Sequence, residues 1–253
     1  MIFYFSATGN SKYVAERIRE ETNEKIVSVV DCLKENNFNF EVDKNERIGF
    51  ITPVYFWGLP TVMSDFLEKL YIKNYAQNYT FLVVTYGTTT GQVKNIVKQK
   101  LFKNNILLDA SFSVKMADTW TPVFDLSNKQ KLQKIEAKSN IEIKEVCKLI
   151  SKNKVGDYSK RKIPKFMVDI YYPTYEKARN TKFFSVDDTC IGCKLCEKKC
   201  PVNAIEIINN KPVWIKEKCT LCLSCLHRCP KFAIQYKEKT RNHGQYLNPY
   251  TKI

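Results

Sequence analysis

Residues 2–22 read IFYFSATGNSKYVAERIREET, an apolar strand that passes through a turn of small and hydroxylated residues into a helix. We expect the strand over Ile2–Phe5 and the helix over Asn10–Thr22. Such a turn presents backbone N–H groups and hydroxyls to a phosphate, with the helix N-terminus directed at its charge. The alternative is a helix that is merely capped. The phosphate-binding candidates are Ser6, Thr8, Gly9, Asn10 and Ser11.

Two other nucleotide-binding classes do not match this turn. It contains no Gly-Lys-Ser/Thr, so a triphosphate-binding loop of the Walker type is not expected. It also lacks G-x-G-x-x-G, which argues against a dinucleotide-binding fold.

Strands and helices continue to alternate as far as about residue 153. This order is typical of an α/β doubly wound parallel sheet with right-handed crossovers and helices on both faces. Between 31 and 46 the chain is rich in Asn and charge, and we expect an irregular crossover without a helix. Further strands are expected at Lys25–Val30, Arg47–Thr52, Thr80–Tyr86 and about Ala110–Met116, and further helices at Thr61–Ile72, Gln92–Lys103 and about Asn128–Lys152.

Two later loops favour a flat ligand at the carboxyl edge of this sheet. They follow the third and fourth strands, and such loops converge with the first turn at the switch point of a doubly wound sheet. Aromatic side chains there can stack on a ring, and four of the eight glycines of the chain lie in the three loops. In the alternative, Tyr55, Phe56 and Trp57 only cover the core. The candidates are Pro53, Val54, Tyr55, Phe56, Trp57, Gly58, Thr85, Tyr86, Gly87, Thr88 and Gly91.

Eight of the ten cysteines lie between Cys190 and Cys229, in two sets that repeat with a period of 29 residues. The sets are Cys190-x2-Cys193-x2-Cys196-x3-Cys200-Pro201 and Cys219-x2-Cys222-x2-Cys225-x3-Cys229-Pro230. Three closely spaced thiolates can hold three corners of a cubane, whereas the fourth points toward the other cluster. We therefore assign Cys190, Cys193, Cys196 and Cys229 to one [4Fe–4S] cluster, and Cys219, Cys222, Cys225 and Cys200 to the other.

Other uses of these cysteines fit the spacing less well. Structural zinc needs four ligands per ion, usually as two separated pairs, and a disulfide framework would spread over the chain. A radical-initiating cluster needs C-x3-C-x2-C, which neither set contains. Cys32 and Cys147 are expected to be ordinary buried thiols. His227, between two ligands, is expected to be an exposed loop residue, with tuning of the cluster potential as the alternative.

Composition excludes several classes of protein. A chain with 44% hydrophobic and 13% aromatic residues is not a disordered tail, and no apolar run approaches the ~18 residues that span a bilayer. The start resembles no signal peptide, so we expect the cytoplasm. Residues 151–253 carry 21 Lys and Arg against 9 Asp and Glu. Anionic clusters offset part of this charge, and no nucleic-acid readout element is found, so no nucleic acid is expected as a partner.

The cysteine motifs resemble bacterial two-cluster ferredoxins over about 50 residues, and the three loops resemble the flavodoxin family. Together the chain is similar to the flavodoxin–ferredoxin fusion proteins of anaerobes. The resemblance implies a flavodoxin-like sheet of five strands in the order 2-1-3-4-5, followed by a small α+β ferredoxin-like domain with two [4Fe–4S] clusters. It also implies FMN, with its phosphate on 6–11 and its ring between 53–58 and 85–91. Gly58 is the candidate peptide for a hydrogen bond from reduced flavin N5, whereas the choice among Tyr55, Trp57 and Trp120 as ring contact is left open.

These expectations divide the chain into four parts. Residues 1–155 form the FMN-binding domain, 156–184 a basic aromatic linker that packs on one or both domains, 185–238 the two-cluster domain and 239–253 an irregular tail.

No nucleophile, His–carboxylate pair or open metal position suggests a catalytic residue. We expect an electron-transfer flavoprotein that relays electrons between the clusters and FMN in anaerobic metabolism, with acidic redox proteins such as a ferredoxin or a reductase as partners. One alternative is an FMN-dependent oxidoreductase that reduces a quinone, a nitro compound or another flavin. A second alternative is a redox sensor.

Overall fold

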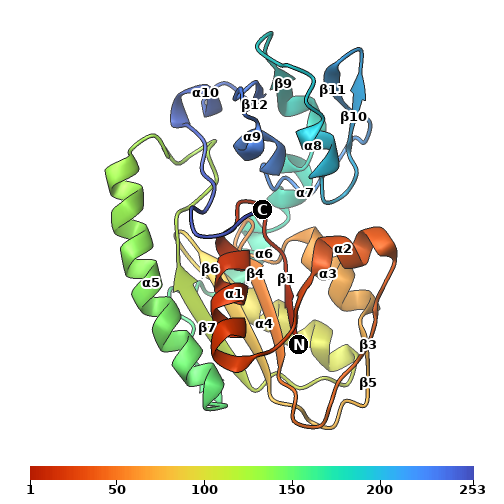
Figure 1. Cartoon of the computed structure of the whole chain (residues 1–253), viewed down its shortest axis with the longest axis vertical. Coiled ribbons are helices and arrows are strands. Elements are labelled where there is room, and N and C mark those ends of the chain that lie inside the picture. The colour runs from red at the N-terminus through yellow and green to blue at the C-terminus, as the bar shows by residue number, and fades with distance from the viewer.

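A parallel six-stranded sheet, in the order β2-β1-β4-β6-β7-β8, forms the centre of the computed structural model, which describes residues 1–253 (Figure 1). Its first five strands have the predicted order 2-1-3-4-5, which is confirmed. The sixth strand was not predicted: Gly156 and Asp157 pair with Ala110 and Ser111 at the edge of the sheet. The strands are β1 (Ile2–Tyr4), β2 (Ile26–Ser28), β4 (Ile48–Pro53), β6 (Thr80–Tyr86), β7 (Ala110–Lys115) and β8 (Gly156–Asp157).

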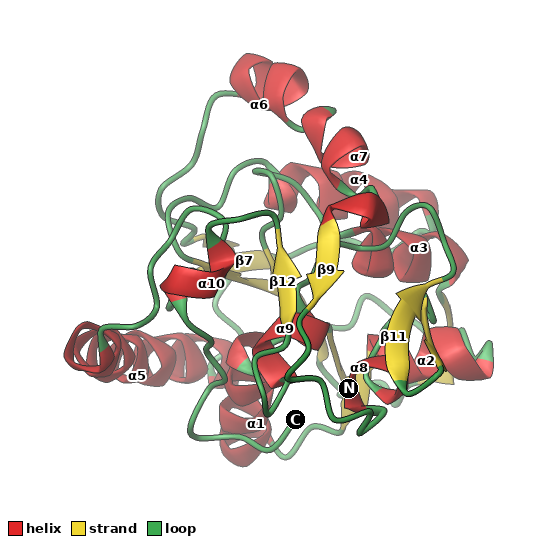
Figure 2. Cartoon of the chain, turned by 90° about the horizontal axis from the view of Figure 1, so that it is seen from above, coloured by secondary structure: helices red, strands yellow, loops and turns green.

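Helices cover both faces of this sheet. The apolar residues of α1 (Asn10–Thr22) and α5 (Lys129–Ser151) form one core with one face of the strands. On the opposite face, a second core contains α2 (Val29–Glu35), α3 (Thr61–Lys69) and α4 (Val93–Lys103). Figure 2 shows α1 and α5 on one side of the molecule and α3 and α4 on the other. The central strands β1, β4, β6 and β7 are therefore buried on both faces, as their continuous apolar runs require, whereas the edge strands β2 and β8 are half-buried and exposed.

The crossover after β2 differs from the expectation. It contains α2, so the prediction of an irregular segment without a helix was wrong. The Ser28 side chain caps this helix by accepting a hydrogen bond from the backbone N–H of Asp31 at 3.3 Å, and Val29 and Cys32 are buried beneath it. Cys147 is also buried, so the expectation of two buried thiols is confirmed. A short parallel pair, β3 (Asn39–Glu41) with β5 (Tyr71–Lys73), lies beside the main sheet.

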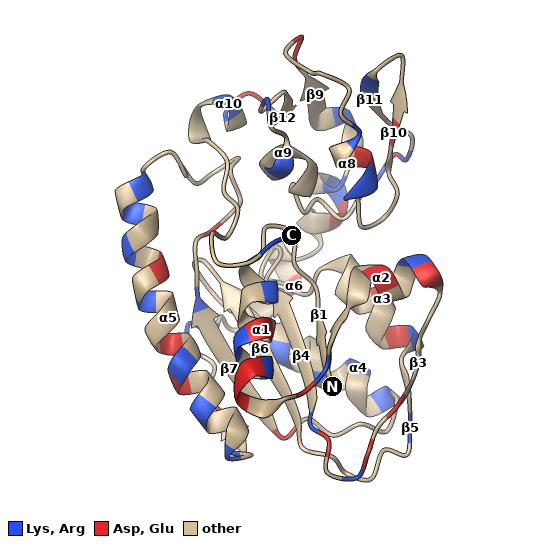
Figure 3. Cartoon of the chain, viewed as in Figure 1, with Lys and Arg blue, Asp and Glu red and all other residues tan.

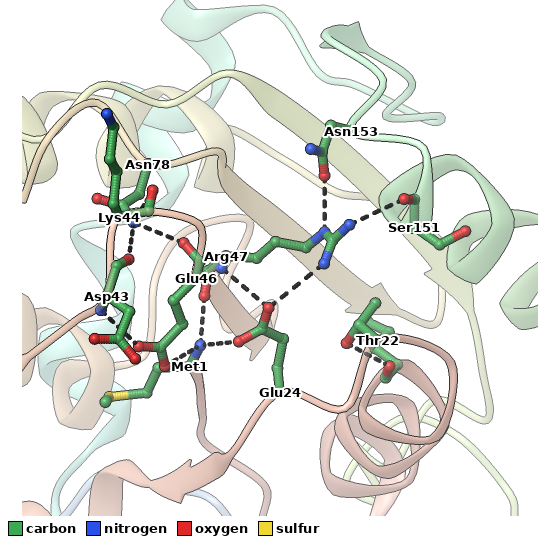
Figure 4. Close-up of polar contacts among 11 residues, drawn as sticks. Met1, Thr22, Glu24, Asp43, Lys44, Glu46, Arg47, Asn78, Ser151 and Asn153 are labelled. Atoms are coloured by element: carbon green, nitrogen blue, oxygen red, sulfur yellow. Dashed lines mark hydrogen bonds and ion pairs between the residues drawn. The ribbon is translucent and has the colours of Figure 1, made fainter.

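The amino ends of the strands are joined by a network of charges (Figure 4). The Met1 amino group lies 2.6 Å from a Glu24 carboxylate oxygen and 2.8 Å from one of Glu46. Arg47 pairs with Glu24 at 3.6 Å and donates through Nε to Asn153 at 2.7 Å. This network lies at the amino edge of the sheet, so the loops at the carboxyl edge are left for a ligand.

The cysteine-rich part forms a small domain over the carboxyl edge of the sheet (Figure 1). Two antiparallel pairs, β9 with β12 and β10 with β11, accompany two short helices that each carry a cysteine. The expected irregular tail contains one helical turn, α10, before it returns to α1. The elements are β9 (Phe184–Val186), α8 (Leu195–Lys198), β10 (Ile205–Ile208), β11 (Lys211–Trp214), α9 (Ser224–Arg228), β12 (Ile234–Tyr236) and α10 (Thr240–His243).

The segment between the two domains packs on both of them. It contains α6 (Lys165–Tyr171), α7 (Thr174–Ala178) and a 3₁₀ turn at Thr181–Phe183. The Tyr172 hydroxyl donates to the Leu59 carbonyl in the sheet domain, and the Tyr175 hydroxyl donates to the Thr220 carbonyl in the cysteine-rich domain at 2.6 Å. Because aromatic residues hold both sides, the expected packing of the linker is confirmed. No helix is long and apolar enough to cross a membrane.

Candidate functional site

A cavity of about 240 Å³ lies between the carboxyl edge of the sheet and the cysteine-rich domain. Three of its walls are the loops after β1, β4 and β6, as the sequence predicted. Two further walls are the loop after β7, at Met116–Trp120, of which only Trp120 was a candidate from the sequence, and the segment Leu221–Leu223 of the cysteine-rich domain, which was not predicted. Of the predicted residues, the cavity is lined by Ser6, Thr8, Asn10, Ser11, Pro53, Val54, Tyr55, Phe56, Trp57, Thr85, Tyr86, Gly87 and Thr88.

The first turn has the polar groups that a phosphate requires. No side chain caps the N-terminus of α1, which leaves this end of the helix to an anionic ligand. The Ser6 hydroxyl accepts a hydrogen bond from the Gly9 N–H at 3.1 Å, and the hydroxyls of Ser11 and Thr85 are 2.8 Å apart. The Asn10 amide donates to the Ala117 carbonyl at 3.2 Å. These bonds connect the turn to the neighbouring loops and hold its hydroxyls in place.

Two residues from the far end of the chain also contact this turn. The Asn248 N–H donates to the Thr8 carbonyl at 2.8 Å, and its side chain donates to the Asn10 side chain at 3.1 Å. Arg228 in α9 donates to the Ala7 carbonyl at 3.1 Å. Neither residue was predicted from the sequence, because nothing in the local pattern of α9 or of the tail indicates which distant turn they reach.

Three predicted glycines lie behind the cavity wall. A Cβ at Gly9, whose φ is +99°, would lie 2.9 Å from Asn248 Cβ, and one at Gly58 would lie 2.3 Å from the Tyr172 ring. One at Gly91 would lie 1.9 Å from the Trp57 carbonyl oxygen. Contacts within the protein therefore require these glycines. A role of the Gly58 peptide toward the flavin stays a prediction, since its N–H and carbonyl both bond Tyr55.

The aromatic turn after β4 is a tight hairpin whose two central residues have positive φ. Phe56 has a φ of +50° and Trp57 a φ of +64°, which is uncommon for bulky residues and is held by the two bonds between Tyr55 and Gly58. The Trp57 ring lies 4.2 Å from that of Tyr171, between centroids. All three candidate ring contacts, Tyr55, Trp57 and Trp120, line the cavity. The hairpin therefore both covers the core and forms a wall of the cavity.

The eight clustered cysteines form two groups. A small outer cavity of about 20 Å³ is lined by the four thiols that the sequence assigned together, Cys190, Cys193, Cys196 and Cys229. In the inner group, Cys222 forms part of the wall of the large cavity. No group of three or more His, Cys, Asp or Glu side chains is arranged for a single metal ion.

Backbone N–H groups are directed at the thiols of both cysteine groups. Ala204 donates to Cys200 Sγ at 3.2 Å, and Ala233 donates to Cys229 Sγ at 3.3 Å, at equivalent places in the two halves of the repeat. Burial raises the pKa of the Cys219 and Cys196 thiols to about 11. Bound iron would take the place of these protons, because coordinating thiols are deprotonated.

His227 is buried, so the expectation of an exposed loop histidine was wrong. Its Nε2 lies 2.9 Å from the Thr119 carbonyl, and its Nδ1 accepts a hydrogen bond from the Tyr246 N–H at 3.2 Å. Burial lowers the pKa of its imidazole to about 4, so the ring is neutral at pH 7. The ring joins α9 to a cavity wall and to the tail.

Fold and site together define an iron–sulfur flavoprotein of electron transfer. The chain belongs to the flavodoxin family, because the family model described as a flavodoxin domain matches residues 1–143. A second family model, the 4Fe-4S dicluster domain, matches residues 182–244. The two domains imply a flavin and iron–sulfur clusters, as the sequence predicted.

Curated relatives match short stretches of the chain. The chain is 46% identical over 48 residues to one component of the ion-translocating oxidoreductase complex of Methanosarcina acetivorans, covering 19% of this chain and 18% of that protein. It is 43% identical over 54 residues to a ferredoxin of Methanothermococcus thermolithotrophicus, covering 20% and 90%. A putative electron transport protein, YsaA, of Escherichia coli is 36% identical over 68 residues, covering 24% and 43%. Most of these matches cover less than half of the relative's length.

Solved structures match part of the chain at low similarity. The rubredoxin oxygen:oxidoreductase of Desulfovibrio gigas has a TM-score of 0.34 and 13% identity, covering 57% of this chain and 35% of that one. The Trp repressor binding protein of Bacillus subtilis has a TM-score of 0.35 and 8% identity, covering 56% and 94%.

Proposed function

We propose that this chain relays electrons between two [4Fe–4S] clusters and one FMN. One observation carries the proposal: Cys222, a predicted ligand of the inner cluster, shares a cavity with the three loops predicted to bind the flavin. FMN would lie in the cavity, held by the flavin-binding unit (1–155). The inner cluster, held by the cluster unit (185–238), would lie at the Cys222 side of the same cavity. Residues 156–184 join the two units. FMN accepts one or two electrons whereas each cubane transfers one, so the pair connects two-electron and one-electron chemistry.

The residues of the large cavity fit FMN. The hydroxyl turn and the uncapped end of α1 would hold the phosphate, and Arg228 adds a positive charge beside the same turn. The aromatic walls at Tyr55, Trp57 and Trp120 would contact the ring. The cavity thus has a polar end and an aromatic end, as a ligand with a phosphate and a flat ring requires.

The two cysteine groups would hold the two cubanes, and their exposure supports an order of electron transfer. The outer group includes Cys193, which is exposed, whereas Cys219 and Cys225 of the inner group are buried. Electrons from a partner would therefore enter at the cluster of Cys190, Cys193, Cys196 and Cys229. They would then pass through the cluster of Cys219, Cys222, Cys225 and Cys200 to FMN.

Anaerobic stopped-flow reduction by a small ferredoxin donor tests this order. Cys222→Ser should leave FMN bound and reducible by dithionite but slow its reduction by the donor, because the inner cluster is lost. Cys193→Ser should slow it as well, since it removes the entry point. Cys147→Ala, which changes a buried thiol in the sheet domain, is the control and should reduce at the wild-type rate. The internal step should not depend on protein concentration. FMN reduction that scales with total protein, or that survives the loss of both clusters, would refute the relay.

One observation favours a second function, the reduction of a small molecule by FMN. Val123 lines the cavity and is 62% exposed, so the cavity reaches the surface at that side. An acceptor such as a quinone, a nitro compound or another flavin would approach the ring there. Steady-state assays with a panel of such acceptors distinguish the functions: saturable turnover at low acceptor concentration indicates the oxidoreductase, and exchange with redox proteins alone indicates the carrier.

The cysteines support our proposal for the compartment and the metabolic setting. None of the ten forms a disulfide, as in proteins of reducing compartments, and we place the chain in the cytoplasm. Exposed cluster ligands such as Cys193 oxidise readily, which suits anaerobic metabolism.

A further inference from the structure

Asp118 is the only carboxylate on the wall of the large cavity, and no Lys or Arg lines it. It lies in the loop after β7, two residues before the candidate ring contact Trp120, and was not itself predicted from the sequence. Its Oδ1 accepts a hydrogen bond from the Trp120 N–H at 3.2 Å. Its Oδ2 has no hydrogen-bond or ion-pair partner in the protein. Half of the carboxylate is therefore anchored and the other half is free to interact with a ligand.

The neighbouring loop is shaped around this side chain. A Cβ at Gly87 would lie 2.2 Å from Asp118 Cβ and 2.3 Å from its Oδ2, so only glycine leaves room for the carboxylate. Gly87 belongs to the loop 85–91, to which we assign the flavin ring. The structure thus holds Asp118 against the backbone of the ring-binding loop.

The surroundings of Asp118 offer it no positive charge. The other titratable groups on the cavity wall are Tyr55, Tyr86, Tyr171 and Cys222, and the neutral His227 lies behind Thr119. Burial raises the pKa of the Asp118 carboxyl, and only the bond from the Trp120 N–H opposes this. An added negative charge in the cavity would favour the protonated carboxyl further, because two like charges close together cannot both stay ionised at low cost.

We propose that Asp118 takes up a proton from solvent when the flavin in this cavity is reduced. The inference rests on the proposed binding of FMN. Two electrons and one proton leave a negative charge on the reduced ring, and Asp118 takes a second proton and becomes neutral. The overall reaction therefore takes up two electrons and two protons. The electrons come from two successive one-electron oxidations of the inner cluster. The protons enter from solvent where the cavity reaches the surface at Val123.

The pH dependence of the FMN midpoint potential tests this proposal, measured by anaerobic spectroelectrochemistry of the holoprotein. In wild type, a pH range should exist in which the potential falls by about 59 mV per pH unit, the value for two protons per two electrons. Asp118→Asn should show about 30 mV per pH unit in the same range, since only one proton is then taken up. The control Asp125→Asn changes an exposed carboxylate nearby and should behave as wild type. Equal slopes in wild type and Asp118→Asn would overturn the proposal.

An infrared difference spectrum of the wild type, reduced minus oxidised, gives a second readout that needs no variant. The C=O band of a protonated carboxyl should appear on reduction and shift in heavy water. Its absence would overturn the proposal even if Asp118→Asn lost its flavin. Failure of the proposed function is a separate result: wild type would then bind no FMN at all, whereas failure of this inference leaves FMN bound with a normal titration.

Discussion

At the scale of single residues, the loop glycines show that a pattern which predicts a ligand site can have another cause. The four loop glycines predicted a backbone that approaches a ring, yet only Gly87 lies on the cavity wall. Gly9 makes room for Asn248, and Gly91 makes room for the Trp57 carbonyl. Because a missing Cβ serves a protein neighbour as readily as a ligand, a glycine in a loop indicates close contact without indicating the partner.

Gly9→Val should weaken FMN binding by roughly tenfold or more and leave the iron content unchanged. A β-branched side chain at a φ of +99° is strained, and its Cβ would displace Asn248 from the phosphate turn. Fluorescence titration of the flavin-free protein with FMN measures the affinity. The control is Gly156→Val, which also has positive φ but no neighbour within 3.4 Å of its Cβ. Equal loss of iron and flavin in Gly9→Val would indicate misfolding instead.

Trp57→Ala should change the potential or the affinity of FMN more than the cluster content. Its ring forms part of the cavity wall and packs on Tyr171, whereas it lies outside both cysteine groups. Redox titration of the flavin, with iron and sulfide analysis of the same sample, measures both effects. Phe102→Ala, an exposed aromatic in α4, should change neither. An unchanged flavin in Trp57→Ala would show that the residue only covers the core.

Among the elements, the five-residue helix α9 belongs to the inner cysteine group and also contacts two loops of the large cavity. It carries Cys225, while His227 and Arg228 bond the loop after β7 and the phosphate turn. The helix therefore connects the inner cysteine group to the proposed flavin. In the proposed relay, this contact between the domains would position the redox groups relative to each other.

Arg228→Gln should lower FMN affinity several-fold and make the inner cluster harder to reduce. The guanidinium lies beside the phosphate turn and shares α9 with Cys225 of the inner group, so its removal takes a positive charge from two sites that carry or gain negative charge. FMN titration and electron paramagnetic resonance redox titration measure the two effects. Arg241→Gln, which breaks an exposed pair with Asp187, is the matched control. A variant with both properties unchanged would remove Arg228 from the proposed site.

At the scale of the whole molecule, the positive charge is concentrated in the half that carries the clusters. Lys194 and Lys231 line the outer cysteine cavity, and Figure 3 shows further Lys and Arg around α8. An acidic redox partner would meet this surface at the exposed Cys193.

Electron transfer from an acidic ferredoxin should therefore slow as salt rises. Screening shortens the range of attraction to about 8 Å at physiological ionic strength. Second-order stopped-flow rates across a series of salt concentrations measure the effect, and dithionite reduction of the flavin, which needs no protein docking, is the comparison. A flat or rising dependence on salt would exclude electrostatic docking.

The order of the five main strands was implied by the resemblance to the flavodoxin family. The sequence by itself determined the alternation of strands and helices, the three loops that follow strands and the two repeated sets of cysteines. These depend on periodicity and spacing, which are local properties of the chain. Only the tertiary structure decided that Leu221–Leu223 and Asp118 would close the cavity, that Arg228 and Asn248 would reach the phosphate turn, and that His227 would be buried. The reason is physical: these contacts join residues up to 240 positions apart, as between Asn248 and Thr8, and depend on how one domain packs on the other.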